Sequence, residues 1–256
     1  MSETAWRRLA SDIVACERCP RLRAHCLEIA RIKRRAYRDQ DYWGRPVPGF
    51  GDHRARLLIV GLAPAAHGAN RTGRMFTGDR SGEWLYQALH RAGFASQGLS
   101  VSRDDGLKLR GVYITAVCRC APPLNRPEPS EIERCAPFLD GEIELLQDLR
   151  VVLALGKVAW DAVVRRACRV SPASVPRPRP AFGHGAAAWL PIRAGAPGLP
   201  LLGCYHPSQQ NTSTGRLTRL MLDAVIGGQV SQFPSTKRGR QGGTELPTCP
   251  QFDKES

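Results

Sequence analysis

The sequence predicts one α/β domain with three layers, in which helices cover both faces of a mainly parallel, four-stranded sheet. Four short apolar runs, at residues 56–61, 112–117, 150–155 and 200–204, have the length and composition of buried strands. Segments whose apolar residues recur with helical spacing alternate with these runs. Strands joined through helices pair in parallel, and the connecting helices then pack on both faces of the sheet.

The expected helices follow from apolar spacing and from residues that favour helix ends. Leu9 and Ile13 lie on one face of a short N-terminal helix, and Gly93 is a stop signal for the helix after the first strand. Ser130 and Glu133 match a capping box, which favours a helix start at this point. The expected helices span residues 3–15, 21–37, 81–92, 130–148, 157–167 and 215–226.

Three segments have no regular period. Residues 41–53 combine Gly, Pro and aromatic residues, which favours a loop. Residues 171–199 are rich in Pro, Gly and Ala and form either a long loop or a hairpin. The polar, Gly-rich tail at 229–256 is expected to be disordered. The domain is therefore expected to span residues 1–228, with the cysteine-bearing helices at its N-terminal end.

The charge balance favours a nucleic-acid partner. Lys and Arg number 37 against 23 Asp and Glu, which gives a formal net charge of +14. Arginine greatly outnumbers lysine, and its planar guanidinium suits bidentate contacts with phosphate. The expected basic helix at 21–37 would add to such a surface. An arginine-rich genome would produce the same bias without a functional reason.

Targeting signals are absent from the sequence. The N-terminal residues lack the apolar core and the small-residue cleavage site of a secretion signal. No run approaches the ~18 apolar residues that a membrane-spanning helix needs. We therefore expect a cytoplasmic protein, and nothing in the sequence indicates more than a monomer.

The cysteines predict a metal or cluster site. Cys16 and Cys19 form a chelating pair, and Cys120 and Cys135 can complete a set of four. Four thiolates suit a structural zinc ion or an iron–sulfur cluster, and spacing alone does not decide between the two. Cys118 is an alternative to Cys120, because the two side chains would face the same side of a strand. In the simplest alternative, Cys16 and Cys19 are free surface thiols.

Polar or glycine-bearing loops follow three of the four expected strands. They read GLAPAAHGANRTGRMFTGD at 61–79, CRCAPPLNRP at 118–127 and YHPSQQN at 205–211. The carboxyl ends of parallel strands meet at one edge of the sheet, so we expect the three loops to converge on one crevice. The first loop contains neither GxxxxGK[ST] nor GxGxxG, so it is not one of the common phosphate-binding loops.

Together these motifs resemble the family 5 (type B) uracil-DNA glycosylases. The resemblance rests on an N-terminal CxxC followed by GLAPA…GxNRTGRxFTGD, RCAPPxNRPxPxEIxxC and HPSxQNTxTGR, in the family's order. It covers most of residues 10–225 and is weakest over 171–199. It implies the uracil-DNA glycosylase fold, a structural 4Fe–4S cluster and a bacterial or archaeal enzyme, associated with the nucleoid while it acts. Such an enzyme removes uracil, and other deaminated bases such as hypoxanthine or xanthine, from DNA.

The resemblance also implies a role for each matching residue. The cluster ligands fall on Cys16, Cys19, Cys120 and Cys135, which favours Cys120 over Cys118. The catalytic residues are Asp79 and His206, and the base-binding residues are Gly61, Leu62, Ala63, Phe76 and Asn125. The DNA-binding residues are Arg71, Arg74, Ser208, Gln209, Gln210 and Asn211, with a wedge into the base stack expected among the last three.

The chemistry of glycosidic cleavage suits these residue types. The transition state carries positive charge on the sugar and negative charge on the departing base. His206 can donate a hydrogen bond to the base oxygen. Asp79 can stabilise the sugar cation, orient a water molecule or take its proton, and the sequence leaves these three roles open. No lysine nucleophile is needed, so we expect a monofunctional glycosylase without strand cleavage.

Each of these residues has a simpler interpretation in isolation. Asp79 would be a helix N-cap, Asn125 a turn residue and His206 a histidine at the end of a strand, and Phe76 would belong to the core. Two other classes of protein also share the cysteine set: an iron–sulfur electron carrier or redox sensor, and a zinc-containing nucleic-acid-binding module without catalysis.

Overall fold

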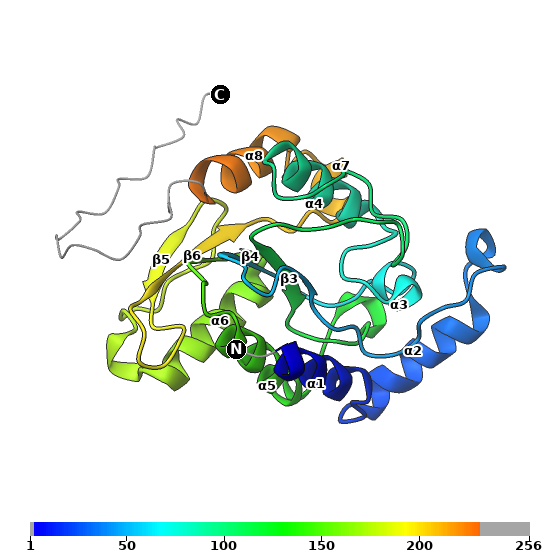
Figure 1. Cartoon of the computed structure of the whole chain (residues 1–256), viewed down its shortest axis with the longest axis horizontal. Helices are drawn as coiled ribbons and strands as arrows, with labels where there is room; N and C mark the ends of the chain where they lie inside the picture. Colours follow the sequence, from blue (N-terminus) through cyan, green and yellow to red (C-terminus); the bar gives the residue numbers. More distant parts are fainter. Residues whose placement is uncertain (1–2, 231–256) are drawn as a thin grey trace.

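A six-stranded sheet lies at the centre of residues 3–230, the part of the chain that the computed structural model describes (Figure 1). Its strand order is β1-β3-β2-β4-β6-β5. The inner strands β3, β2, β4 and β6 run parallel, and both edge strands pair antiparallel with their neighbours. The strands are β1 Phe50–Gly51, β2 Leu57–Gly61, β3 Val112–Ala116, β4 Val151–Leu155, β5 Ala187–Leu190 and β6 Leu199–Cys204.

The four inner strands confirm the predicted parallel sheet, whereas the edge strand β1 was missed and β5 falls in the segment predicted as either a loop or a hairpin. β1 lies in the segment expected to be a loop, and only two of its residues pair with β3. Gly51 has a φ of +142°, and an added Cβ would lie 2.3 Å from the Val112 carbonyl oxygen, so this pairing needs glycine. β5 pairs with β6, so residues 171–199 contain the hairpin arm that the sequence left as an alternative to a loop.

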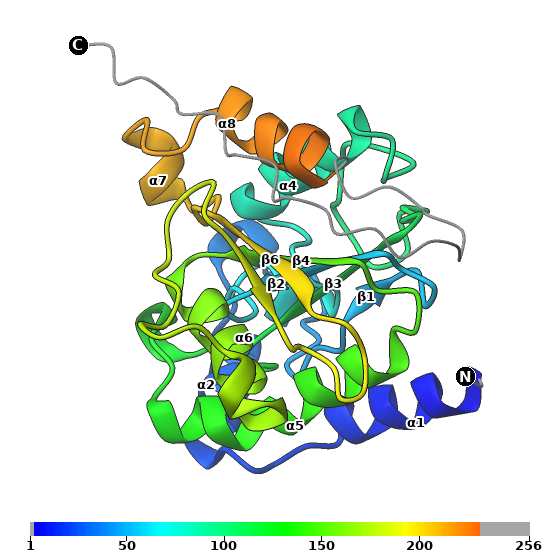
Figure 2. The same ribbon diagram turned by 90° about the vertical axis from the view of Figure 1, so that its left-hand side faces the viewer.

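The helices lie on both faces of the sheet, as predicted. Figures 1 and 2 show α4 and α8 over one face, with α1, α5 and α6 over the other. The helices are α1 Glu3–Val14, α2 Pro20–Ile32, α3 Ala69–Thr72, α4 Arg80–Arg91, α5 Pro129–Leu145, α6 Lys157–Val170, α7 Gln209–Ser213 and α8 Arg219–Asp223.

Several helix boundaries differ from the prediction, and the short α3 was not expected. The second helix ends at Ile32, and a separate 3₁₀ turn follows at Arg35–Tyr37. α5 begins before the expected capping box, and the Glu128 backbone N–H donates to the Glu131 carboxylate at 2.7 Å. The helix expected at 215–226 begins later, as α8 at Arg219, and continues into a π-helical turn at Ala224–Gln229, while the short α7 precedes it where no helix was expected. Gly215, with a φ of +72°, lies between α7 and α8.

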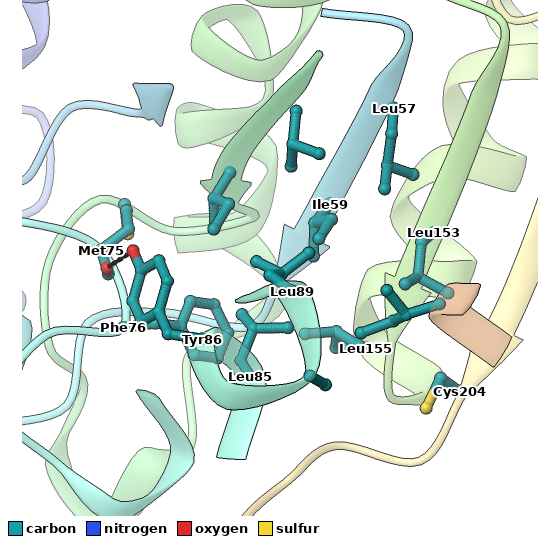
Figure 3. Packing of buried hydrophobic residues seen from close by; sticks show 14 of the residues in the cluster. Leu57, Ile59, Met75, Phe76, Leu85, Tyr86, Leu89, Leu153, Leu155 and Cys204 are labelled. Atoms are coloured by element: carbon teal, nitrogen blue, oxygen red, sulfur yellow. Dashed lines mark hydrogen bonds between the residues drawn. The ribbon is translucent and has the colours of Figure 1, made fainter. Parts of the chain in front are cut away.

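Alternate residues of each strand build the two cores. Leu57 and Ile59 of β2 pack with Leu85 and Leu89 of α4 (Figure 3). Leu58 and Val60 face the other way, toward the core formed with α1, α5 and α6. Burial of a Leu or Ile side chain stabilises a fold by about 1.5–3 kcal/mol. The continuous apolar strands are therefore packed against helices on both faces, and the loops at their carboxyl ends are free to form a site.

The domain end predicted at residue 228 stays a prediction. Val230 is buried in the core formed with α4 and α8. The predicted disorder of the tail falls on residues 231–256, which lie outside the described residues, and stays a prediction. Among the helices of residues 3–230, none has the length and apolar character needed to cross a membrane.

Candidate active site

A cavity of about 340 Å³ lies where the three loops meet at the carboxyl ends of the strands. This confirms the predicted convergence of segments that are far apart in the sequence. The lining residues are Leu62, Ala63, Ala65, Met75, Phe76, Asp79, Ser81, Asn125, His206, Ser208 and Gln209. Met75 and Ser81 were not singled out by any motif argument, and their only signal was proximity to Phe76 and Asp79 along the chain.

The turn after β2 supports the cavity through its backbone. The carbonyls of Gly61 and Leu62 accept hydrogen bonds from the amides of Val117 and Cys118, both at 3.0 Å. Gly61 does not line the cavity itself. An added Cβ at Gly61 would lie 2.8 Å from the Phe76 ring, so its lack of a side chain makes room for that ring.

Phe76 presents its ring to the cavity from a strained backbone. Its φ of +54° lies in the left-handed region, which non-glycine residues seldom adopt. The ring stacks against His206, with centroids 5.7 Å apart and an interplanar angle of 29°. On the preceding residue, the Met75 carbonyl accepts a hydrogen bond from the buried Tyr86 hydroxyl at 2.8 Å (Figure 3). The strained residue is thus anchored to α4 through its neighbour.

Arg74 lies beneath this loop and is engaged inside the protein. It is 4% exposed, and its guanidinium donates to both carboxylate oxygens of Asp105 at 2.8 and 2.7 Å. It also donates to the hydroxyls of Thr77 and Ser100, each at 2.9 Å. Burial alone would raise the pKa of Asp105, but the hydrogen bonds from Arg74 and from backbone amides lower it to about 2.

Arg71 has similar internal partners. It donates to the carbonyls of His67 at 2.8 Å and Gly78 at 2.9 Å, and its guanidinium lies 4.0 Å from the centroid of the Tyr37 ring. The phosphate contacts expected of Arg71 and Arg74 stay predictions. Both guanidinium groups hold the loop that carries Phe76 and Asp79, so a phosphate would have to compete with these partners.

Asp79 is a helix cap and a cavity residue at once. Its Oδ1 accepts a hydrogen bond from the Gly82 backbone N–H at 2.9 Å at the start of α4. An added Cβ at Gly68 would lie 2.0 Å from Oδ2, so glycine is required beside the carboxylate. Burial raises the pKa of Asp79. The simpler interpretation is therefore correct for one oxygen, while the side chain also lines the cavity.

His206 reaches the cavity from the end of β6. Burial lowers its pKa to about 4, so the imidazole is neutral near pH 7 and has one N–H to donate. Its backbone carbonyl accepts a hydrogen bond from Asn211 Nδ2 at 2.8 Å. Asn211 thus supports the His206 loop from α7, while Ser208 and Gln209 line the cavity and Gln210 is exposed.

Asn125 closes the cavity from the loop after β3. Its φ of +55° is one that Asn tolerates better than most residues, and its backbone N–H donates to the Pro122 carbonyl at 3.1 Å. It is a turn residue, as the simpler interpretation holds, and its side chain lines the cavity. An amide offers both a donor and an acceptor to whatever enters.

The four predicted cysteine ligands lie around a second, much smaller cavity. Cys16, Cys19, Cys120 and Cys135 all line a space of about 20 Å³. Cys118 does not line it. Cys118 is buried in the core shared with α5 and α6, and its hydrogen bond to Cys135 lowers the pKa of the Cys135 thiol to about 7.

Arginines complete the wall of this cysteine cavity. They are Arg18, Arg23, Arg119 and Arg134. Among the described side chains, Nε of Arg23 and Nε of Arg119 are buried donors without a hydrogen-bond partner. Within residues 3–230, no three His, Cys, Asp or Glu side chains are grouped so that they could hold a metal ion.

Comparison with known proteins agrees with this geometry. Residues 48–226 match the Uracil DNA glycosylase superfamily, a span that contains the whole sheet and every residue of the larger cavity. Many unrelated α/β proteins have a cavity at their strand ends, and the family match identifies which class of α/β protein this one is. The chain belongs to the uracil-DNA glycosylase superfamily, as the resemblance predicted.

Individual relatives narrow the position within that family. The chain is similar to the type-5 uracil-DNA glycosylase of Mycobacterium bovis, at 55% identity over 84% of this chain and 76% of the relative. It is 49% identical to the type-5 uracil-DNA glycosylase of Thermus thermophilus, over 84% of this chain and 92% of the relative. Its identity to the type-5 uracil-DNA glycosylase of Pyrobaculum aerophilum is 45%, over 84% and 87%.

Proposed function

We propose that this protein is a monofunctional uracil-DNA glycosylase, which flips uracil out of DNA and hydrolyses its N-glycosidic bond to leave an abasic site. One observation carries the proposal: Phe76, Asn125, His206 and Asp79 come from three distant loops and line the same cavity. Each has the chemistry that one part of this reaction needs. Relatives that bear the name type-5 uracil-DNA glycosylase support the proposal over most of the chain.

The flipped base is bound by stacking and by its edge. Removal of a base from the duplex costs a few kcal/mol, which contacts in the cavity must offset. The Phe76 ring offers a flat apolar face that Arg74 and Tyr86 hold in position through neighbouring residues. The Asn125 amide complements the N3–H donor and O4 acceptor of uracil. Leu62 and Ala63 line the cavity where the edge of the base would lie.

The bond is broken by stabilisation of charge on both fragments. His206 is neutral near pH 7, so it donates an N–H to the base oxygen on which negative charge grows. Asp79 faces the sugar side, where its carboxylate offsets the oxocarbenium charge and orients the attacking water. The capping hydrogen bond from Gly82 holds Oδ1 of this carboxylate in place at the cavity wall.

We further propose a structural 4Fe–4S cluster bound by Cys16, Cys19, Cys120 and Cys135. The donor chemistry fits, since four thiols from three segments line one cavity. The arginine wall fits as well, because a cluster with four thiolates is an anion and its sulfur atoms accept hydrogen bonds. The unpartnered Nε atoms of Arg23 and Arg119 would find acceptors there. The cavity is narrow, so the thiols would rotate outward to admit the cluster, which takes no part in the cleavage step.

The wider setting of the enzyme follows from its proposed substrate. We propose that it acts as a monomer on genomic DNA in the cytoplasm, in keeping with the bacterial and archaeal sources of its relatives. We also propose that hypoxanthine and xanthine are substrates, because the cavity measures about 340 Å³ and Ala63 and Ala65 are small residues in its lining.

One assay tests the enzyme proposal. A duplex with one deoxyuridine is incubated with the protein and then treated with alkali, and a cut strand is expected at that position. Duplexes with hypoxanthine or xanthine, each opposite all four bases, extend the test to the base range. If no alkali-labile site forms on any of them, the protein is no glycosylase. A visible absorption band that dithionite bleaches is expected for the cluster, and a colourless zinc protein would contradict it.

A further inference from the structure

Leu124 is a large apolar side chain held in water beside the cavity. It is 87% exposed, more than the other exposed large hydrophobic residues of the described chain, of which Leu220 at 81% comes next. The next residue, Asn125, lines the cavity, whereas Leu124 does not. Leu124 therefore stands on the outer side of the loop whose inner side meets the bound base.

The backbone at this point is strained. Leu124 has a φ of +53° and Asn125 one of +55°. Left-handed backbone is uncommon for any residue with a Cβ, and Leu lacks the local hydrogen bonding that makes Asn tolerant of it. Strain that persists at the rim of a functional cavity, on a side chain with nothing to pack against, suggests a function outside the folded protein.

The loop is nevertheless rigid. The amides of Asn125 and Arg126 donate to the carbonyls of Pro122 and Pro123 at 3.1 and 3.0 Å. Arg21 of α2 donates to the Arg126 carbonyl at 3.3 Å. The same guanidinium is hydrogen-bonded to the Glu131 carboxylate of α5, at 2.9 and 2.8 Å. The backbone next to Leu124 is thus tied to neighbouring segments by hydrogen bonds.

We propose that Leu124 is the wedge that enters the base stack of duplex DNA beside the flipped nucleotide, an inference that rests on the proposed glycosylase function. An apolar side chain between base steps compensates for lost stacking, as in other proteins that separate bases. Entry into the stack also removes the side chain from water. Because Leu124 and Asn125 are adjacent on a rigid turn, the same rigid loop fills the gap and holds the extruded base.

The expected wedge at Gln209–Asn211 is less suited to this task. Gln209 already lines the cavity, and Asn211 is hydrogen-bonded to the His206 carbonyl. The remaining Gln210 is polar and gains little by leaving water for a base stack. Mutation can therefore distinguish the two candidate wedges, the apolar Leu124 and the polar Gln210.

The test compares duplex with single-stranded substrate, because only a duplex has a stack for a wedge to support. Leu124→Ala is expected to lower kcat/KM on duplex deoxyuridine by about tenfold or more, with single-stranded cleavage within about twofold of wild type. Leu124→Asn, which suits the left-handed backbone, should show the same selective loss. Leu220→Ala is the matched control and should change neither activity, because this leucine is also exposed but belongs to α8.

A second readout follows base extrusion directly. With 2-aminopurine next to the deoxyuridine, the rise in fluorescence on binding should be weaker for Leu124→Ala than for wild type or for Gln210→Ala. Equal loss on duplex and single strand, or no loss on duplex, would overturn the wedge assignment. So would a duplex-selective loss in Gln210→Ala alone. Absence of wild-type cleavage on duplex deoxyuridine would instead count against the glycosylase proposal itself.

Discussion

The two cavities of the molecule differ in size and in what surrounds them. The larger, of about 340 Å³, lies at the strand ends and is lined by apolar side chains together with a few polar ones, including Asp79, Asn125 and His206. The smaller, of about 20 Å³, is enclosed by four thiols and four guanidinium groups. The larger has room for a base as it stands. The smaller admits an occupant only if the side chains around it move.

The largest expected effect concerns Asp79, which takes part in both folding and catalysis. Asp79→Asn keeps an oxygen that can accept the Gly82 hydrogen bond, and Asn is a good N-cap. We expect kcat to fall by roughly 10²–10⁴-fold with little change in melting temperature. Asp79→Ala should lose the same activity and also about 1 kcal/mol of stability. Single-turnover cleavage and thermal unfolding of the two variants would measure this, and activity retained in Asp79→Asn would exclude the carboxylate from the reaction.

His206 is expected to give the next largest effect. His206→Ala removes a donor to the base oxygen, so we expect kcat to fall by roughly 10²–10³-fold while DNA affinity changes little. Since the pKa of His206 is about 4, its protonation should not shape the rate between about pH 5 and 8. If the wild-type rate instead falls as the pH rises through about 6, and the rate of His206→Ala does not depend on pH, the imidazole acts as a cation.

The same pKa shift has a consequence for stability. His206 has a folded pKa of about 4, below its ordinary value, so at acid pH the unfolded chain binds this proton more readily than the folded one. Its contribution to stability is present at neutral pH and is lost as the pH falls from about 6.5 toward 4. Chemical unfolding across this range should show a smaller loss of stability in His206→Gln than in the wild type.

The smaller cavity is tested by a pair of cysteines two residues apart. Cys120 lines it and Cys118 does not. We expect Cys120→Ala to lose the visible absorption and iron content and to unfold at a lower temperature. Cys118→Ala should retain both cofactor signals and lose only about 1–2 kcal/mol from its core position. The reverse result would make Cys118 the ligand and would mean that the end of β3 rearranges around the cluster.

Sequence reasoning reached the inner sheet and the convergence of loops because these follow from strong local patterns. Runs such as Leu57–Gly61 are apolar throughout, and parallel strands necessarily share one carboxyl edge. Edge strands β1 and β5 are short or alternate weakly in burial, so only their pairing with β3 and β6 defines them. The break between α7 and α8 likewise depends on one glycine that could have lain within a helix.

Sequence patterns do not reveal which residues pair with buried charges. The charge of Arg74 is evident from the sequence, but its partner Asp105 belongs to a loop 31 residues away. A basic residue in a surface loop is therefore easily assigned to phosphate from the sequence, which does not show an internal partner such as Asp105. Asp79 shows the converse, because a local cap signal and a functional position coincide in one side chain.

Arg74 provides the mildest and most discriminating test of how the larger cavity is held. Lysine keeps the charge but cannot bind both oxygens of Asp105 in a fork. We expect Arg74→Lys to lower kcat/KM by about tenfold through loss of Phe76 positioning, with an unchanged dependence of DNA affinity on salt. If Arg74 instead contacts a phosphate, its removal in Arg74→Ala should reduce the salt slope by about one. Arg166→Lys is the control, since Arg166 is a buried arginine that pairs with Asp140 and Glu144, none of which lines the cavity, and it should lose stability alone. If Arg74→Lys cleaves more slowly than an Arg166→Lys variant of similar stability, Arg74 positions Phe76. If the two variants cleave at equal rates, Arg74 forms only a structural ion pair.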